Sequence, residues 1–92
     1  MKMDEKIRSA IVERVSMEGY AAKMGLKLIQ VSSGGAVVEM VPRKDDENIF
    51  GMVHGGAIFS LIDEAFQASC NSHGRVAVAL NINVMFHAPP AF

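Results

Sequence analysis

The chain has 92 residues, a formal net charge of −1 and one cysteine. This length limits it to one domain, and a chain so short buries only about 60% of the surface that its unfolded form exposes. Nine basic residues against ten acidic ones argue against a nucleic-acid binder, which normally carries a basic face. A lone cysteine excludes an intrachain disulfide, and no Cys/His cluster has the spacing of a zinc site.

The distribution of apolar and charged residues bears on compartment and assembly. No apolar run reaches about 18 residues, and the N-terminus leads into no signal-type segment, so we expect a cytoplasmic protein with no membrane partner. Of the 28 residues from Ala65 to Phe92, only Arg75 is charged. A third of the chain therefore lacks solvating groups, and we expect a second copy to cover it in a homo-oligomer.

The N-terminal segment carries helical periodicity. Over residues 3–17, apolar side chains such as Ile7, Ile11 and Val15 recur at spacings of three and four. This pattern predicts a helix, with Gly19 as its stop.

Two short apolar runs follow, around a turn. Residues 26–32 and 36–41 read as strands, and the Ser-Ser-Gly-Gly sequence at 32–35 predicts an antiparallel hairpin between them. Alternation gives the first strand one face with Leu26, Leu28 and Gln30 and another with Ile29 and Val31. We expect residues 43–48 to form a charged, solvated loop.

The C-terminal half predicts a long helix and a long strand. Helical periodicity runs over 55–71, and Gly74 is a suitable C-terminal stop. Residues 76–86 are rich in Val and Ile and predict a strand, which Pro89-Pro90 breaks. The order of elements is that of an α+β fold.

Two adjacent carboxylates on the long helix differ in their expected surroundings. At 100° per residue, Ile58, Leu61, Ile62, Ala65 and Ser69 form an apolar face, whereas Ser60, Glu64, Gln67 and Asn71 form a polar one. Asp63 lies on the border, beside Phe59 and Phe66. We therefore expect Glu64 to be an ordinary solvated or hydrogen-bonded carboxylate, and we expect desolvation to raise the pKa of Asp63, which makes it a candidate catalytic group. The competing interpretation, a partly exposed Asp63 without a role, stays open on this pattern alone.

The sequence His54-Gly55-Gly56 stands at the start of the same helix. Consecutive glycines leave the first helical N–H groups unshielded at the positive end of the helix dipole. Such groups suit an anion, or an oxyanion that forms on a carbonyl. Alternatively, the glycines only permit a tight turn from loop to helix.

The spacing of these two features predicts a site shared between chains. Gly55 and Asp63 are eight residues apart, which is about 12 Å along a helix axis. An Asp side chain cannot bridge that gap. If both groups serve one reaction, they come from two chains of a dimer with composite sites.

Asn48, Gly51 and the run His-Gly-Gly-Ala-Ile-Phe-Ser-Leu-Ile-Asp-Glu-Ala-Phe at 54–66 resemble the signature of the hotdog-fold acyl-CoA thioesterases. The similarity is to the phenylacetic-acid-degradation thioesterase family within the 4-hydroxybenzoyl-CoA thioesterase superfamily, and it covers about residues 18–92. It implies a hotdog fold, in which an antiparallel sheet wraps around a long central helix. It also implies hydrolysis of an acyl-CoA to free acid and CoA, with no metal or cofactor, by a dimer or a dimer of dimers.

The resemblance also implies roles for individual residues. Asp63 matches the catalytic carboxylate, a nucleophile or general base, and Gly55 matches the residue whose N–H polarises the thioester carbonyl from the other subunit. The positions that match substrate-binding residues are Asn48, His54, Gly56 and Gln67. Asn48 and His54 would also shape the loop, and Gln67 is the weakest match because its residue type varies.

Family members continue with further strands where this chain ends, so we expect residues 1–92 to be a single but incomplete thioesterase domain. It would consist of an N-terminal helix over 1–18 and a hotdog core over 19–92 without its C-terminal strands. Two alternatives to a thioesterase remain: a non-catalytic acyl-CoA-binding module and an inactive truncated fragment. A hydratase-type hotdog enzyme fits less well, because the spacing of His54 and Asp63 matches the thioesterase pattern better.

Overall fold

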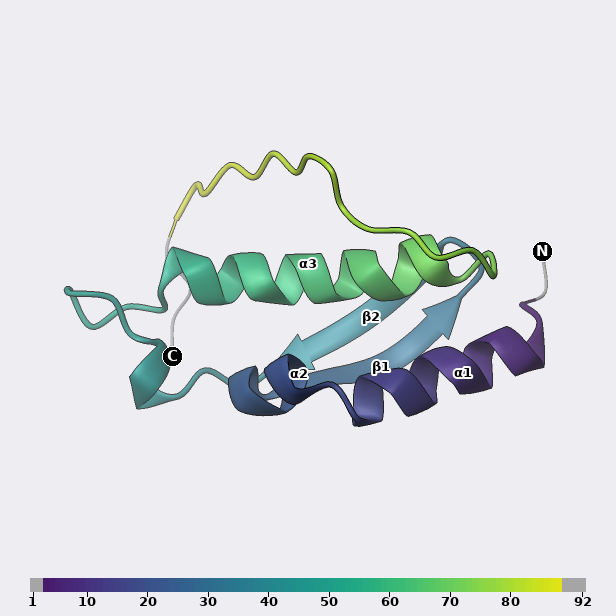
Figure 1. Ribbon diagram of the computed structural model, residues 1–92. Coiled ribbons are helices and arrows are strands. Elements are labelled where there is room, and N and C mark those ends of the chain that lie inside the picture. The colour runs from purple at the N-terminus through teal and green to yellow at the C-terminus, as the bar shows by residue number, and fades with distance from the viewer. Residues whose placement is uncertain (1–2, 89–92) are drawn as a thin grey trace.

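The computed structural model describes residues 3–88 and contains three α-helices, two strands and one turn of 3₁₀ helix (Figure 1). In chain order these are α1 (Glu5–Ser16), α2 (Gly19–Met24), β1 (Leu26–Ser32), β2 (Gly35–Met40), η1 (Lys44–Asp46) and α3 (Gly55–Asn71). The expected α+β class is confirmed. In this part of the chain, no helix is both long and apolar enough to span a bilayer.

The N-terminal helix is confirmed, but it begins at Glu5 rather than residue 3 and is followed by a second helix. Asp4 caps α1, because its carboxylate accepts a hydrogen bond from the Lys6 N–H at 2.8 Å. The expected stop at Gly19 is wrong: α1 ends at Ser16, and Gly19 is the first residue of α2. The second helix ends at Gly25, whose φ of 68° is the left-handed conformation that glycine adopts without strain.

The hairpin is confirmed, but one face of its first strand is not. Antiparallel pairing runs from Leu26 opposite Met40 to Ser32 opposite Gly35, with a register shift between Leu28 and Gln30. The extra residue at this bulge, Ile29, is 56% exposed. A bulge reverses the alternation of side chains between the two faces of a strand. Val31 was predicted to lie on the face opposite Leu26, but it lies on the buried face and is 1% exposed.

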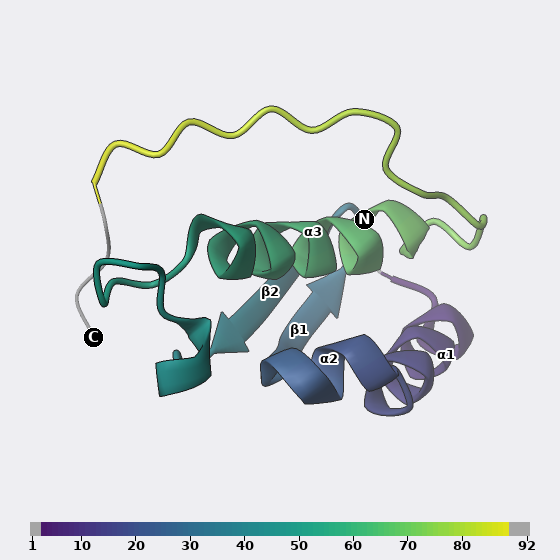
Figure 2. The ribbon, with the colours of Figure 1, turned by 60° about the vertical axis from the view of Figure 1, so that its left-hand side comes forward.

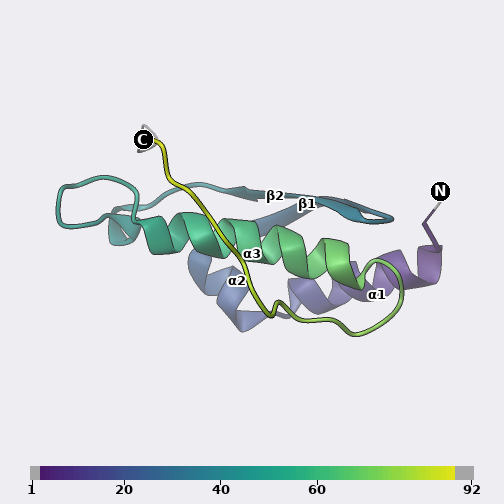
Figure 3. The same ribbon diagram turned by 90° about the horizontal axis from the view of Figure 1, so that it is seen from above.

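The long helix α3 spans 55–71 as predicted and lies across the hairpin, with α1 and α2 beside it (Figures 1 and 3). The hydrophobic core lies where α1, the hairpin and the C-terminal half of α3 meet. Its buried members are Met3, Ile11, Val31 and Ala68, and Ile7, Val15, Leu28 and Ala36 pack against them.

The predicted strand over 76–86 does not form. This segment has no regular hydrogen-bonded structure, and it runs back along α3 on the side away from α1 and α2 (Figures 1 and 2). A strand forms by hydrogen bonding to a neighbouring strand, and neither β1 nor β2 lies beside this segment (Figure 1). The Asn71 side chain anchors the segment instead: its amide donates to the Ala77 carbonyl at 3.0 Å and its oxygen accepts from the Ala77 N–H at 2.9 Å. Pro89 and Pro90 lie outside the described residues.

Candidate functional site

The first turn of α3 is built by His54 and leaves one backbone donor free. His54 caps the helix: the Gly56 N–H donates to its Nδ1 at 2.8 Å, and the Ala57 and Ile58 N–H groups donate to its carbonyl at 3.0 and 3.2 Å. Within residues 3–88, no acceptor pairs with the N–H of Gly55. A polarised donor is therefore available at the positive end of the helix dipole, as the sequence suggested.

Gly55 and Gly56 differ in the space that surrounds them. A Cβ on Gly56 would lie 3.0 Å from Nδ1 of His54, so a side chain there would push the imidazole away from its cap. A Cβ on Gly55 would meet only the Phe86 ring, at an ordinary 3.8 Å. Space is therefore tight at position 56, whereas position 55 is open enough for a ligand to approach the backbone.

The loop before α3 is shaped by Asn48 and Asp46. The Asn48 Oδ1 accepts hydrogen bonds from the N–H groups of Phe50, at 2.9 Å, and Met52, at 3.0 Å, around Gly51 with φ +75°. Asp46 was expected in a solvated loop. That expectation is wrong, because it is 5% exposed and its carboxylate accepts from the Arg43 N–H at 2.8 Å. Its carbonyl accepts from the His54 N–H at 2.7 Å, which fixes the loop to the helix start.

Asp63 lies two turns further along α3 and is half-buried. Its carboxylate has no hydrogen-bond donor or cation paired with it in the part of the chain that the structure describes. Phe59, Ile62 and Phe66 are 37–41% exposed, so Asp63 lies among apolar side chains at an open surface. With α3 regular from 55 to 71, the rise from Gly55 to Asp63 is about 12 Å. The two groups cannot act on one carbonyl within one chain.

Of the two surroundings expected for Glu64, solvated or hydrogen-bonded, solvation is wrong. Glu64 is not solvated but 5% exposed, on a buried face with Ala57, Ser60 and Ala68. The pKa of Glu64 is raised to about 8, chiefly because burial disfavours its charged form. Its hydrogen-bonded interaction with Glu18, and then the negative charges of Glu18 and Asp63, raise the pKa further. The helical wheel placed Ser60 and Glu64 on one face, as observed, but this polar face is the buried one because α2 covers it: the Tyr20 hydroxyl and Ser60 Oγ are 2.6 Å apart.

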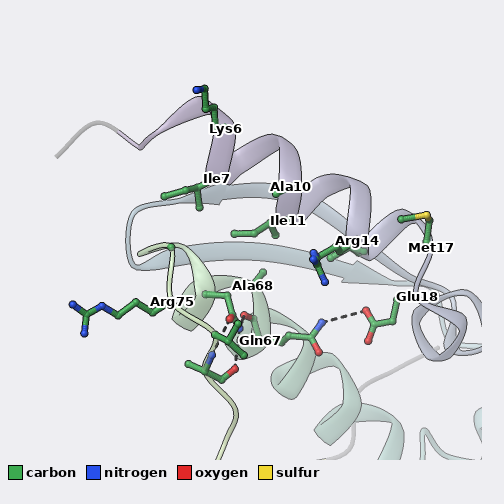
Figure 4. Close-up of a pocket in the computed structure, with 15 residues that line it drawn as sticks. Lys6, Ile7, Ala10, Ile11, Arg14, Met17, Glu18, Gln67, Ala68 and Arg75 are labelled. Atoms are coloured by element: carbon green, nitrogen blue, oxygen red, sulfur yellow. Dashed lines mark hydrogen bonds between the residues drawn. The ribbon is translucent and has the colours of Figure 1, made fainter.

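Gln67 faces the N-terminal helices. Its amide donates to Glu18 Oε1 at 3.2 Å across a cavity of about 700 Å³, formed by α1, the C-terminal half of α3 and residues 74–77 (Figure 4). Neither Gly55 nor Asp63 lines this cavity. The structure therefore separates Gln67 from Gly55 and Asp63 and pairs its exposed side chain with Glu18.

A smaller hollow lies at the start of α3. It has a volume of about 240 Å³ and is lined by Val53, Gly55, Ile58, Phe86, His87 and Ala88. His87 is a residue that sequence reasoning missed, because only the return of the 76–88 segment along α3 brings it to Gly55. Among residues 3–88, no three metal-ligating side chains gather into a cluster.

Comparison with known proteins shows which proteins this chain is similar to. Residues 50–92 match the thioesterase superfamily. The chain is 39% identical over 72 residues to acyl-coenzyme A thioesterase PaaI of Escherichia coli, covering 78% of this chain and 51% of the relative. Residues 50–92 thus form a region of thioesterase-superfamily sequence. A protein of Archaeoglobus fulgidus is 36% identical over 84 residues, which cover 86% of this chain and 54% of that protein.

The backbone agrees with the same family. The solved structure of the Escherichia coli PaaI protein, from the phenylacetic acid degradation operon, superposes with a TM-score of 0.87 at 32% identity. The match covers 95% of this chain and 63% of PaaI, and the chain spans about half the length of the curated relatives named above. The hotdog fold is thus represented here by its long helix and a two-stranded antiparallel sheet, fewer strands than the complete fold has.

Proposed function

We propose that this chain is the catalytic part of an acyl-CoA thioesterase, which hydrolyses a CoA thioester to a free acid and CoA. The observation that carries the proposal is the unpaired N–H of Gly55 at the start of α3, in a chain related to an acyl-coenzyme A thioesterase. A thioester carbonyl placed at that N–H would be polarised, and the same donor would stabilise the oxyanion that forms on attack.

Asp63 supplies the attacking or proton-accepting group in this proposal. As nucleophile it would form an anhydride with the acyl group and release CoA thiolate, and water would then hydrolyse the anhydride to the free acid and restore the Asp63 carboxylate. As general base it would deprotonate the attacking water. Its half-buried carboxylate, with no partner among residues 3–88, supports either role.

Each reaction centre would combine Gly55 of one chain with Asp63 of another, because about 12 Å of helix separates them within a chain. The apolar surface around Asp63 supports such a pairing. The functional unit is thus a homodimer, or a tetramer built from two dimers. Residues 1–92 would act as one domain in the cytoplasm, with Asn48 and His54 holding the helix start toward the substrate.

The test is release of free thiol from a panel of aryl-CoA and short acyl-CoA thioesters. Asp63→Asn should lower kcat by roughly two to four orders of magnitude, as expected for an essential acid–base group. Glu64→Gln is the matched control on the adjacent residue and should retain activity at neutral pH, since Glu64 is already protonated there. Equal losses in the two variants would refute the assignment to Asp63. CoA-ester binding without turnover by the wild type would favour the non-catalytic module instead.

A further inference from the structure

Glu64 is an anomaly that the proposed reaction does not use. It lies on α3, 5% exposed, and no group within residues 3–88 forms a hydrogen bond with its Oε2. A buried ionised carboxylate without a partner is costly, and protonation relieves much of that cost.

The neighbour of Glu64 is a second carboxyl group. Glu18 stands immediately before α2 at its N-cap position, yet its side chain caps no N–H of that helix. It is turned to α3 instead, where it accepts a hydrogen bond from the Gln67 amide (Figure 4). There it also interacts with the Glu64 carboxyl group. Ionisation of both carboxyl groups is unfavourable because their charges repel each other, so Glu64 keeps its proton while it lies beside Glu18.

No cation neutralises this pair in the part of the chain that the structure describes. On α3 itself, Asp63 adds a further negative charge that also disfavours ionisation of Glu64. Arg14 of α1 lines the cavity that Glu18 borders, but it forms no ion pair. On the strands that α3 covers, Lys27 and Glu39 stand opposite each other and are exposed.

The carboxyl pair lies at the contact between α2 and α3. Besides the Glu18 contacts, the polar link between the two helices is the Tyr20 hydroxyl to Ser60 Oγ, at 2.6 Å. Ala21 is 2% exposed in the same short helix. A helix of six residues is not stable by itself, so its place depends on this contact.

We propose that Glu18 and Glu64 form a one-proton latch, which holds α2 against α3 and opens when the pair loses its proton. When Glu64 ionises, the carboxylates of Glu18, Asp63 and Glu64 bring three negative charges together where α2 begins. Repulsion and the demand for solvation then favour the undocked helix. The latch stands independently of the thioesterase proposal.

Hydrogen exchange on the full chain tests the latch. The pKa of Glu64 is about 8 when α2 is docked on α3 and its ordinary 4.5 when α2 is released. Separation of α2 from α3 should therefore become about tenfold more frequent per pH unit between pH 6 and 8. Exchange protection of the α2 amides, corrected for intrinsic chemistry, should fall by that factor and level off above about pH 8. At each pH it should be lower than protection in the C-terminal half of α3. Tyr20 is the single tyrosine in a chain without tryptophan, so its fluorescence reports the same event.

Three variants decide the outcome. Glu64→Gln keeps the shape and a donor for Glu18 but has no proton to lose, so the pH dependence of α2 protection should disappear. Glu18→Gln removes the second charge, so protection should level off at a lower pH than in the wild type. Glu13→Gln, an exposed acid on α1, should behave as the wild type. The latch is refuted if Glu64→Gln keeps the wild-type slope, if Glu18→Gln leaves the profile unchanged, or if α2 and α3 amides show equal protection at each pH.

Discussion

Replacement of Gly55 by proline removes one hydrogen-bond donor and very little else. Gly55 is the first residue of α3, the helical position where proline is well tolerated because its φ is already helical. The preceding residue, His54, has φ −64° and ψ 137°, the extended conformation that a residue before proline prefers. A Cβ at position 55 meets the Phe86 ring at 3.8 Å, an ordinary contact. Proline should therefore leave the fold intact and raise its thermal stability slightly, since it restricts the unfolded chain.

The effect on catalysis should be large by contrast. Loss of one oxyanion donor typically lowers kcat by about 10²–10³, or roughly 2.7–4 kcal/mol of transition-state stabilisation. Gly55→Ala keeps the N–H and adds the same Cβ, so it is the matched control and should retain most of the activity. The assay is thiol release from an acyl-CoA that the wild type hydrolyses, beside a thermal melt of each variant. A Gly55→Pro variant that melts like the wild type and turns over equally fast would refute the role of this N–H.

Two further predictions concern stability. Because Glu64 keeps its proton to about pH 8 in the folded chain but loses it near 4.5 when unfolded, the free energy of unfolding should fall as pH rises from about 5 to 8, by at most about 1.4 kcal/mol per unit. Denaturant titrations should show this fall in the wild type and a flatter profile in Glu64→Gln; an increase of stability with pH over this range would contradict the assignment. Gly74→Ala should destabilise the chain by at least about 1–2 kcal/mol, since Gly74 has φ +81° and the new Cβ would lie 2.8 Å from Ile7 Cδ1. Gly19→Ala, with nothing within 4 Å, should be neutral or stabilising, and similar midpoints for the two alanine variants would refute this reasoning.

Local sequence patterns predicted the elements that local interactions create. The helix over 55–71 and the hairpin both follow from periodicity and turn residues. Periodicity could not predict which face of β1 each side chain beyond Ile29 occupies, because the bulge arises from the pairing of β1 with β2. The extended segment over 76–86 has the composition of a strand, but strand formation also requires a neighbouring strand.

The candidate site shows the same division. The free N–H at the start of α3 was predictable because it depends on adjacent residues, whereas the cap that His54 places on the Gly56 N–H was not predicted. The surroundings of Glu64 were not predictable, because a helical wheel shows which residues share a face but not which face another element covers. Here α2, which the sequence did not reveal, covers the polar face through Glu18 and Tyr20.

Subunit complementation tests the shared reaction centre most directly. Gly55→Pro and Asp63→Asn should each be inactive alone, since every centre then lacks one of its two groups. In a mixed dimer, one centre would carry both intact groups and the other both defects. Random assortment of equal amounts should therefore restore about a quarter of wild-type thioesterase activity, for independent centres in a two-fold dimer. If mass spectrometry shows that mixed dimers form and they still have no thioesterase activity, the shared reaction centre is contradicted.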